Sequence, residues 1–453
     1  MNNNSPTKPF KHRIIKASIW IFGGYFISQL IRLGSNLVMT RLLAPEMFGL
    51  MSIVILIMVG VALFTDIGLA PNVIQSKKSN DPEFMDAIWT IQILKGLFIW
   101  FLMIFFSVII YMLIHYRLMP LNTVYANPLL PILVPILSFS IVINGLEPTW
   151  TMLATKEMNQ SLITKIEIGS QFISVIVMII WADFDKSIWA LVAGGLSASI
   201  AKCLLTYQFR YGRLNLWRLD YKVIREVFGF GKWILISTMV GVYAINGDRI
   251  LLGGMINEHK LGLYSIAYLI ISAVSAIYGK LLASVVYPAF CEANHQGDEK
   301  LKQTYYKFQY LADFGLYLTA GILFVAASSM IDFLYDNRYH ETGQILQVIS
   351  ISLIGLRFYV AEQCFIALGK PYMTTYCIIA RTACLFISVP IAFHYFGFNG
   401  ALWAIVVSNF ASFPFVFFFK EKLKMLSLNR ELVTLPIFGV GILIGKLIVV
   451  VLV

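Results

Sequence analysis

Arginines inside long apolar stretches are the residues of this 453-residue sequence that are hardest to explain by packing alone. Arg32, Arg357 and Arg381 lie deep in three such stretches. An ionised side chain at the centre of a bilayer costs at least about 2.5 kcal/mol on insertion scales, so it normally pairs with another charge or lines water. Guanidinium groups bind phosphate or carboxylate through two hydrogen bonds and stay charged at any working pH. The three arginines therefore predict a buried site for an anion.

Polar residues at helical spacing accompany the arginines. Gln29 and Asn36 share a helix face with Arg32, at i−3 and i+4. Glu362 follows Arg357 in the same stretch, and a polar stripe also runs past Arg381. Such a stripe on an apolar helix predicts a water-filled lumen, whereas the alternative is hydrogen bonding between neighbouring helices. The predicted anion site consists of Arg32, Arg357, Arg381, Gln29, Asn36 and Glu362.

A second set of charges lies near the ends of apolar stretches. Asp66 ends the second stretch and Lys95 lies early in the third, while Lys280 and Asp313 occupy the equivalent places in the second half. We expect these four residues, together with Asp248, to gate the lumen or to bind a coupling ion, H⁺ or Na⁺. The alternative is a static role, because buried charges commonly form permanent pairs.

Motifs for catalysis or metal binding are missing from the sequence. The six histidines are scattered, and no GxxxxGK[ST] loop for nucleotide phosphates is present. The five cysteines form no CxxC pair and lie in or beside apolar stretches, where they resemble small buried hydrophobic residues. We therefore expect neither an enzyme nor a cofactor or metal site.

The composition identifies an integral membrane protein. Hydrophobic residues make up 58% of the chain and charged residues only 13%, whereas soluble domains carry about 25% charged residues. The net charge of +11 does not indicate nucleic-acid binding, because membrane proteins concentrate Lys and Arg in cytoplasmic loops.

Thirteen apolar stretches are long enough to cross a bilayer, which takes roughly 20 residues per helix. In the loops between them, 21 basic residues fall on the side of the N-terminus and 5 on the other side. The positive-inside rule then places the N-terminus in the cytoplasm. The stretches are 17–38, 48–70, 87–114, 128–148, 163–182, 188–208, 230–252, 263–285, 309–330, 344–366, 374–395, 399–419 and 433–453.

The chain divides at its largest basic loop, 209–232. The motif FGLMSI at 48–53 opens the second span, and LGLYSI at 261–266 opens the eighth span from the same side. A repeat that keeps its orientation predicts two six-helix lobes related by an axis along the membrane normal, as in transporters. We expect lobes at 1–208 and 233–419, a cytoplasmic linker at 209–232, and a loop with an extra helix at 420–453.

An ordered series of short motifs resembles the polysaccharide-transport flippases of the multidrug/oligosaccharidyl-lipid/polysaccharide exporter superfamily. The two longest are RLLAPEMFG at 41–49 and DIGLAPNVIQ at 66–75. The series is most similar to the branch that exports colanic-acid or teichuronic-acid type repeat units. The remaining motifs lie at 187–192, 230–231, 246–248, 253, 261–264, 267, 288–289, 367–370 and 397–401.

The resemblance implies a function and a location. Such proteins fold as two six-helix lobes in a V around a central lumen, in the bacterial inner membrane. They move undecaprenyl-pyrophosphate-linked oligosaccharide repeat units between leaflets by alternating access, alongside polymerase and chain-length machinery. Family members usually have an even number of spans, so the thirteenth stretch, 433–453, departs from the pattern and leaves the side of the C-terminus open.

Other functions remain open from the sequence. A cation-coupled drug or small-solute antiporter belongs to the same superfamily, but several deep arginines favour an anionic substrate. A flippase for lipid II also remains open, because the deep arginines could bind any polyprenyl diphosphate. A membrane polymerase or ligase is the rival from another class, and the short outer loops argue against it because such enzymes typically carry a sizeable catalytic loop.

Overall fold

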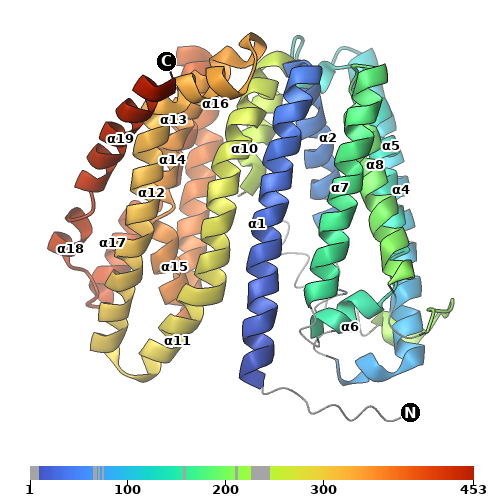
Figure 1. Cartoon of the computed structure of the whole chain (residues 1–453), viewed down its shortest axis with the longest axis horizontal. Coiled ribbons are helices and arrows are strands. Elements are labelled where there is room, and N and C mark those ends of the chain that lie inside the picture. The colour runs from blue at the N-terminus through green and yellow to red at the C-terminus, as the bar shows by residue number, and fades with distance from the viewer. Residues whose placement is uncertain are drawn as a thin grey trace. The chain divides into compact units, whose positions relative to one another are not determined.

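The computed structural model describes residues 10–64, 69, 72–73, 76–156, 160–209, 213–225 and 245–452. Within these ranges the elements are all helical, as predicted, and no strand is present (Figure 1). Asp66 and most of the predicted seventh span, 230–252, lie outside the described residues.

Nine helices of the described ranges are long and apolar enough to cross a membrane, or ten when the bent pair α5 (Leu130–Gly145) and α6 (Trp150–Lys156) is taken as one span. One of them, Pro371–Lys422, has 52 residues, more than twice what one crossing needs. It holds the predicted spans 374–395 and 399–419. The chain reverses at Gly397, whose φ of 64° is a backbone conformation that glycine adopts without strain.

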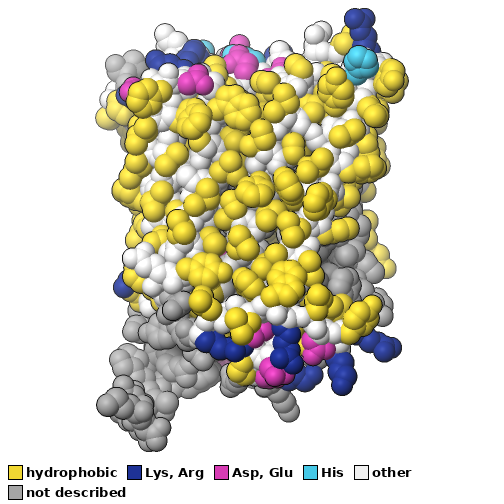
Figure 2. All heavy atoms as spheres, turned by 90° about the vertical axis from the view of Figure 1, so that its right-hand side faces the viewer, with side chains coloured by type: hydrophobic (Ala, Val, Ile, Leu, Met, Phe, Trp, Pro, Cys, Tyr) yellow, Lys and Arg dark blue, Asp and Glu magenta, His cyan; other side chains and the backbone are white. Residues whose placement is uncertain are grey.

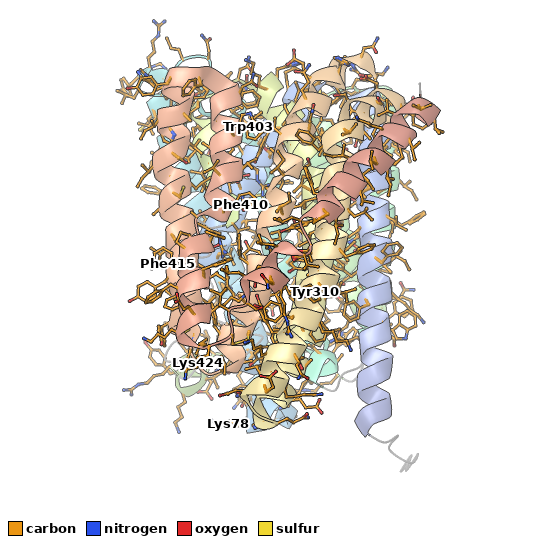
Figure 3. The ribbon with its side chains drawn as sticks, turned by 90° about the vertical axis from the view of Figure 1, so that its left-hand side faces the viewer. Lys78, Tyr310, Trp403, Phe410, Phe415 and Lys424 are labelled. Atoms are coloured by element: carbon orange, nitrogen blue, oxygen red, sulfur yellow. The ribbon has the colours of Figure 1, made fainter. Side chains whose placement is uncertain are left out.

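The surface shows where the membrane lies. Figure 2 shows a broad hydrophobic band on one face, with most of the Lys, Arg, Asp and Glu side chains gathered at its two ends. On α4 (Pro82–His115), Phe98, Phe101 and Phe105 each expose about 60% of their surface. Figure 3 shows a second face, where the exposed Trp403, the half-buried Phe410 and the exposed Phe415 follow one another down to Lys424. Aromatic and aliphatic side chains exposed in this way are stable against lipid and not against water.

The chain forms two compact units. The first comprises residues 1–43, 54–119 and 126–242, and the second comprises 44–53, 120–125 and 243–453. Several helices begin at a proline (Pro45, Pro82, Pro371 and Pro436), where the missing N–H lacks an intrahelical partner in any case.

Close packing in the first unit depends on small residues. Gly96 on α4 lies against the backbone of Ile141 on α5, and Gly145 on α5 lies against Gln92 on α4. The Oγ of Ser174 on α7 donates to the carbonyl of Gly194 on α8 at 2.8 Å. Small residues let helix backbones approach each other in membranes. The helices of this unit are α1 (Phe10–Leu42), the end of α2 (Pro45–Phe64), η1 (Lys77–Asn80), α4, α5 (Leu130–Gly145), α6 (Trp150–Lys156), α7 (Gln160–Phe184) and α8 (Trp189–Gln208).

The described part of the basic linker, 213–225, is anchored to the first unit. Asp86 on α4 is only 4% exposed, pairs with Arg213 and accepts the N–H of Leu216 at 3.1 Å. The N–H of Arg218 donates to Thr90 Oγ1 at 2.9 Å. These bonds satisfy backbone groups of an extended segment, so the segment runs along α4 instead of forming a free loop.

The second unit contains the C-terminal helix α19, which the sequence left without a clear place. Gly321 on α12 and Gly441 and Gly445 on α19 bring the two backbones into close contact, and Figure 1 shows the helices side by side. The described part of the predicted span 433–453, helix α19 (Pro436–Leu452), is therefore an integral part of this unit. The remaining elements are η2 (Val124–Ala126), α10 (Glu258–Leu281), η3 (Leu282–Val286), α11 (Tyr287–His295), α12 (Asp298–Leu334), η4 (Asn337–Tyr339), α13 (His340–Ser350), α14 (Ser352–Gly355), α15 (Phe358–Ala367), α16 (Pro371–Phe410), α17 (Phe413–Lys422), α18 (Leu428–Leu432) and α19 (Pro436–Leu452).

The two repeated motifs meet each other in the second unit. A Cβ added to Gly49 would lie 2.1 Å from the carbonyl oxygen of Glu258, and one added to Gly262 would lie 1.9 Å from that of Pro45. The equivalent glycines of the repeat thus form one reciprocal contact between the starts of α2 and α10.

This contact predicts that a single methyl group added at Gly262 destabilises the protein. In Gly262→Ala the new Cβ meets backbone atoms, so α2 and α10 must separate, at a cost of about 1–3 kcal/mol typical of overpacking. We expect a lower melting temperature of the purified protein. Gly279→Ala on the same helix has no atom within 4 Å of the new Cβ and is the matched control. Equal melting temperatures of the two variants would contradict the contact.

Candidate functional site

Arg381 on α16 and Glu362 on α15 form a bidentate ion pair. The Arg381 guanidinium donates through Nη1 to Glu362 Oε1 and through Nη2 to Glu362 Oε2, the latter at 3.2 Å. The same guanidinium lies 4.5 Å from the ring centroid of Tyr359. Glu362 is 5% exposed, so the pair is shielded from water. Two predicted site residues are thus brought together, beside an aromatic ring.

Arg249 forms a second arginine–tyrosine contact in the same unit. Its guanidinium lies 4.3 Å from the ring centroid of Tyr268 and donates to Asn246 Oδ1 at 2.9 Å. The neighbouring acid, Asp248, is buried and accepts the hydroxyl of Tyr264. Arg249 lies near the end of the predicted seventh span, 230–252, and was not among the predicted site residues. Its partner Tyr268 lies on another helix, α10, so no spacing within one helix could have linked the two residues.

Both arginine–tyrosine contacts lie within the second unit. We refer to Arg249, Tyr268, Tyr359 and Arg381 as the arginine–tyrosine set. Guanidinium groups bind anions and aromatic rings stack against sugars, so the set can make both kinds of contact once an anion displaces Glu362 from Arg381.

Arg357 occupies a different environment. It is 7% exposed, and its Nη2 lies 3.0 Å from Asp313 Oδ2 on α12 and 2.9 Å from Glu431 Oε2 on α18. Its Nη1 donates to the hydroxyl of Tyr317 at 2.8 Å. Because two carboxylates already neutralise this guanidinium, the placement favours the helix–helix role for Arg357 over the lumen role.

Lys420 completes a four-charge cluster of Asp313, Arg357, Lys420 and Glu431. Lys420, the next residue after the twelfth predicted span, is only 1% exposed and pairs with Glu431. The cluster contains two acids and two bases, so its net charge is zero. Hydrogen bonds to Asp313 come from Gln309 at 2.9 Å and Thr434 at 2.7 Å. The cluster ties α12, α15, α17 and α18 together inside the second unit.

The predicted residues of the first unit lie on α1 and α4. Gln29 is 8% exposed, Asn36 is half-buried and Arg32 is exposed on α1. Lys95 is half-buried on α4, and Lys280 is exposed in the last turn of α10 of the second unit. Asp313, expected near Lys280, has Arg357 as its ion-pair partner. Asp66, the expected partner of Lys95, lies outside the described residues.

Comparison with known proteins identifies the family. A family model described as "Polysaccharide biosynthesis protein" matches residues 38–344. The teichuronic acid biosynthesis protein TuaB of Bacillus subtilis (strain 168) is 22% identical over 287 residues, which cover 63% of this chain and 57% of that protein. The lipopolysaccharide biosynthesis protein WzxC of Escherichia coli (strain K12) is 21% identical over 334 residues, covering 72% of this chain and 64% of that protein. The chain thus matches about three fifths of the length of these relatives.

A solved structure shows the same fold. The lipid II flippase MurJ in an inward closed conformation superposes with a TM-score of 0.65 at 13% identity, over 97% of this chain and 98% of that one. At this identity the likeness concerns the fold alone. It agrees with the all-helical architecture and the two compact units. The match over 38–344 confirms the resemblance drawn from the motifs: the chain belongs to the polysaccharide biosynthesis protein family.

Proposed function

We propose that this protein is a flippase that moves polyprenyl-pyrophosphate-linked oligosaccharide repeat units across the bacterial inner membrane for surface polysaccharide synthesis. The observation that carries the proposal is the arginine–tyrosine set. Its two guanidinium groups suit a diphosphate or a uronic acid, and its two rings suit sugars. TuaB and WzxC, whose names refer to teichuronic acid and lipopolysaccharide synthesis, support this substrate class.

In the proposed mechanism, the pyrophosphate of the substrate competes with Glu362 for Arg381. In the described conformation both of its terminal nitrogens donate to Glu362. A pyrophosphate oxygen that approaches Arg381 replaces a carboxylate oxygen, which keeps the arginine paired at every stage. Alternating access exposes the substrate site first to the cytoplasmic and then to the outer side.

The rival functions fit the residues less well. An antiporter for cationic drugs needs a site with excess negative charge, whereas Arg381 balances the one acid with which it pairs, Glu362, and so leaves no such excess there. An enzyme that polymerises glycans needs catalytic groups at the outer face, and the residues singled out here lie within apolar helices. We further propose a cytoplasmic N-terminus, from the distribution of basic loop residues.

Deletion of the gene in its own host tests the proposal. We expect loss of surface polysaccharide and accumulation of lipid-linked repeat units in the inner leaflet, where they stay inaccessible to a membrane-impermeant glycosidase. Loss of a polymerase would instead leave single repeat units outside the cell. Unchanged surface polysaccharide, or repeat units accessible outside, would overturn the flippase proposal. The wild-type gene on a plasmid is the control.

A further inference from the structure

A polar pocket lies between α11 and α12 in the second unit, and it includes none of the residues assigned to the proposed substrate site. The chain turns from one helix into the other at Gly297, whose φ of 108° is a conformation that glycine adopts without strain. The rings of Phe290 and Phe308, 5.9 Å apart, pack the two helices together. Beside Phe308 a cavity of about 420 Å³ remains, within the range of roughly 300–1,000 Å³ typical of small-molecule sites.

The lining of this α11–α12 pocket is mostly polar and carries a net positive charge. Ala289 and Ala293 lie one turn apart on α11, and their small side chains leave the space open. The charged side chains of the lining are one acid, Glu292, and two bases, Lys300 and Lys307. The described lining therefore has a net charge of +1.

The two lysines of the pocket are available to a ligand. Both are exposed, and neither forms an ion pair or a hydrogen bond with the described part of the chain. Lys300 and Lys307 are seven residues apart on α12, which puts them on one face, about 10 Å apart along the helix axis. Their flexible stems allow both ammonium groups to reach one anion that lies between them.

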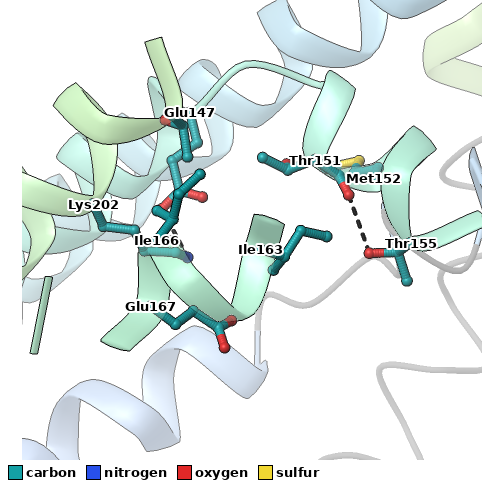
Figure 4. A pocket seen from close by; sticks show the side chains of 9 residues that line it. Glu147, Thr151, Met152, Thr155, Ile163, Ile166, Glu167 and Lys202 are labelled. Carbon is teal, nitrogen blue, oxygen red and sulfur yellow. Dashed lines mark hydrogen bonds and ion pairs between the residues drawn. The ribbon is translucent and has the colours of Figure 1, made fainter. Parts of the chain in front are cut away.

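A smaller pocket beside α6 in the first unit differs from the α11–α12 pocket. It has a volume of about 150 Å³, and the apolar side chains of Met152, Ile163 and Ile166 form much of its lining (Figure 4). The buried carboxylate of Glu147 already pairs with Lys202 on α8 at 2.9 Å. There the lysine is neutralised by the protein itself, whereas the lysines of the α11–α12 pocket are not.

The face of α12 that carries the lysines continues into an apolar surface. Leu311 and Phe314 follow Lys307 by four and seven residues, so they lie on the same face. They are 70% and 55% exposed, and apolar side chains exposed in this way on a membrane helix contact lipid tails. A ligand with an anionic headgroup in the pocket and acyl chains along Leu311 and Phe314 would match both parts of this face.

We propose that the α11–α12 pocket binds the headgroup of a membrane phospholipid that carries one negative charge and free hydroxyl groups, as phosphatidylglycerol does. The single charge of the phosphodiester balances the net charge of the lining, and Lys300 and Lys307 donate to its oxygens. Glu292 accepts a hydroxyl of the glycerol headgroup, as does the side-chain oxygen of Gln303, whose amide nitrogen donates to Glu299 at 3.5 Å. A zwitterionic headgroup would leave the charge of the pocket unbalanced.

The pocket lies at a basic end of the second unit. Lys302 on α12 donates to the carbonyl of Lys424 at 3.2 Å, and Lys422 and Lys424 are exposed. The positive-inside rule assigns such an end to the cytoplasmic side. Anionic lipids make the surface of the cytoplasmic leaflet negative, and basic pockets between membrane helices on this side bind anionic headgroups.

Native mass spectrometry of the purified full-length protein, titrated with defined phospholipids in detergent, tests this proposal without any glycan, so its outcome is independent of the proposed flippase function. We expect one phosphatidylglycerol per chain to bind at least tenfold more tightly than phosphatidylethanolamine. The double variant Lys300→Gln/Lys307→Gln weakens this binding at least tenfold. The matched control Lys422→Gln/Lys424→Gln removes the same charge from exposed lysines at the same end and leaves binding unchanged.

Phosphatidylethanol, which has the same charge but no hydroxyl group on its headgroup, separates recognition of the headgroup from general attraction of anions. We expect wild type to bind phosphatidylglycerol at least threefold more tightly than phosphatidylethanol, and Glu292→Ala to bind both equally because the acceptor of the hydroxyl is lost.

Four results would overturn the proposal. Phosphatidylglycerol binds no more tightly than phosphatidylethanolamine or phosphatidylethanol, or the two double lysine variants lose affinity equally. Alternatively, Glu292→Ala keeps the preference of wild type for phosphatidylglycerol over phosphatidylethanol. Finally, excess inorganic phosphate displaces the bound phosphatidylglycerol, which would show that the pocket binds a soluble anion.

Discussion

Glu431→Gln destabilises the protein by about 3–5 kcal/mol, the cost typical of removing one partner from a buried ion pair. Glu431 is 4% exposed and pairs with both Arg357 and Lys420. Its neutralisation leaves the four-charge cluster with an excess positive charge that water cannot reach. The measurement is the midpoint of thermal unfolding in detergent, followed by size-exclusion chromatography of heated samples.

A matched acid and a compensating variant control this prediction. Glu421→Gln removes an exposed carboxylate from the neighbouring α17, and we expect it to be nearly neutral. The double variant Glu431→Gln/Lys420→Met restores zero net charge and regains most of the lost stability. If Glu431→Gln and Glu421→Gln unfold at the same temperature, the cluster does not stabilise the second unit.

Arg381→Ala lowers export of lipid-linked repeat units at least tenfold at equal membrane abundance. A hydrogen bond to a charged group is worth about 1.5–3 kcal/mol, and tenfold corresponds to about 1.4 kcal/mol. Arg381→Lys keeps the charge but loses the planar fork, so we expect an intermediate rate. The measurement is surface polysaccharide in the deletion host, normalised to the amount of protein in the membrane.

The variant Glu362→Gln distinguishes two roles of Arg381: binding of the substrate, or a purely structural ion pair with Glu362. If Arg381 binds the pyrophosphate, loss of the competing carboxylate leaves export intact or raises it, since the guanidinium becomes more available. If the Arg381–Glu362 pair only holds α15 and α16 together, Glu362→Gln is as damaging as Arg381→Ala. The second result would show that Arg381 does not bind the substrate.

Much of the fold could be predicted from the sequence because bilayer thickness imposes a length of about 20 apolar residues on each span. The reversal at Gly397 was visible as a boundary between two stretches. The packing of α19 against α12 was not predictable, because it depends on glycines of two helices far apart in the chain, Gly321 and Gly441. Glycine in a membrane helix is too common to indicate a partner.

The site could be predicted only in part. Spacing within one helix shows which residues share a face, as for Gln29 and Arg32, but it does not show which charge on another helix will pair with them. Arg357 was therefore expected in a lumen, and its two carboxylate partners come from α12 and α18. Lys420 and Glu431 were assigned to a loop because they follow an apolar stretch.

Reconstitution tests the flippase proposal most directly. Purified protein is placed in proteoliposomes with fluorescent polyprenyl-pyrophosphate-linked glycans extracted from the host, and an impermeant reagent quenches the label in the outer leaflet. We predict that wild-type vesicles lose the inner-leaflet signal with time, whereas Arg381→Ala vesicles lose it at least tenfold more slowly and protein-free vesicles retain it. Translocation no faster than in protein-free vesicles, by protein that is folded and correctly inserted, would contradict the account.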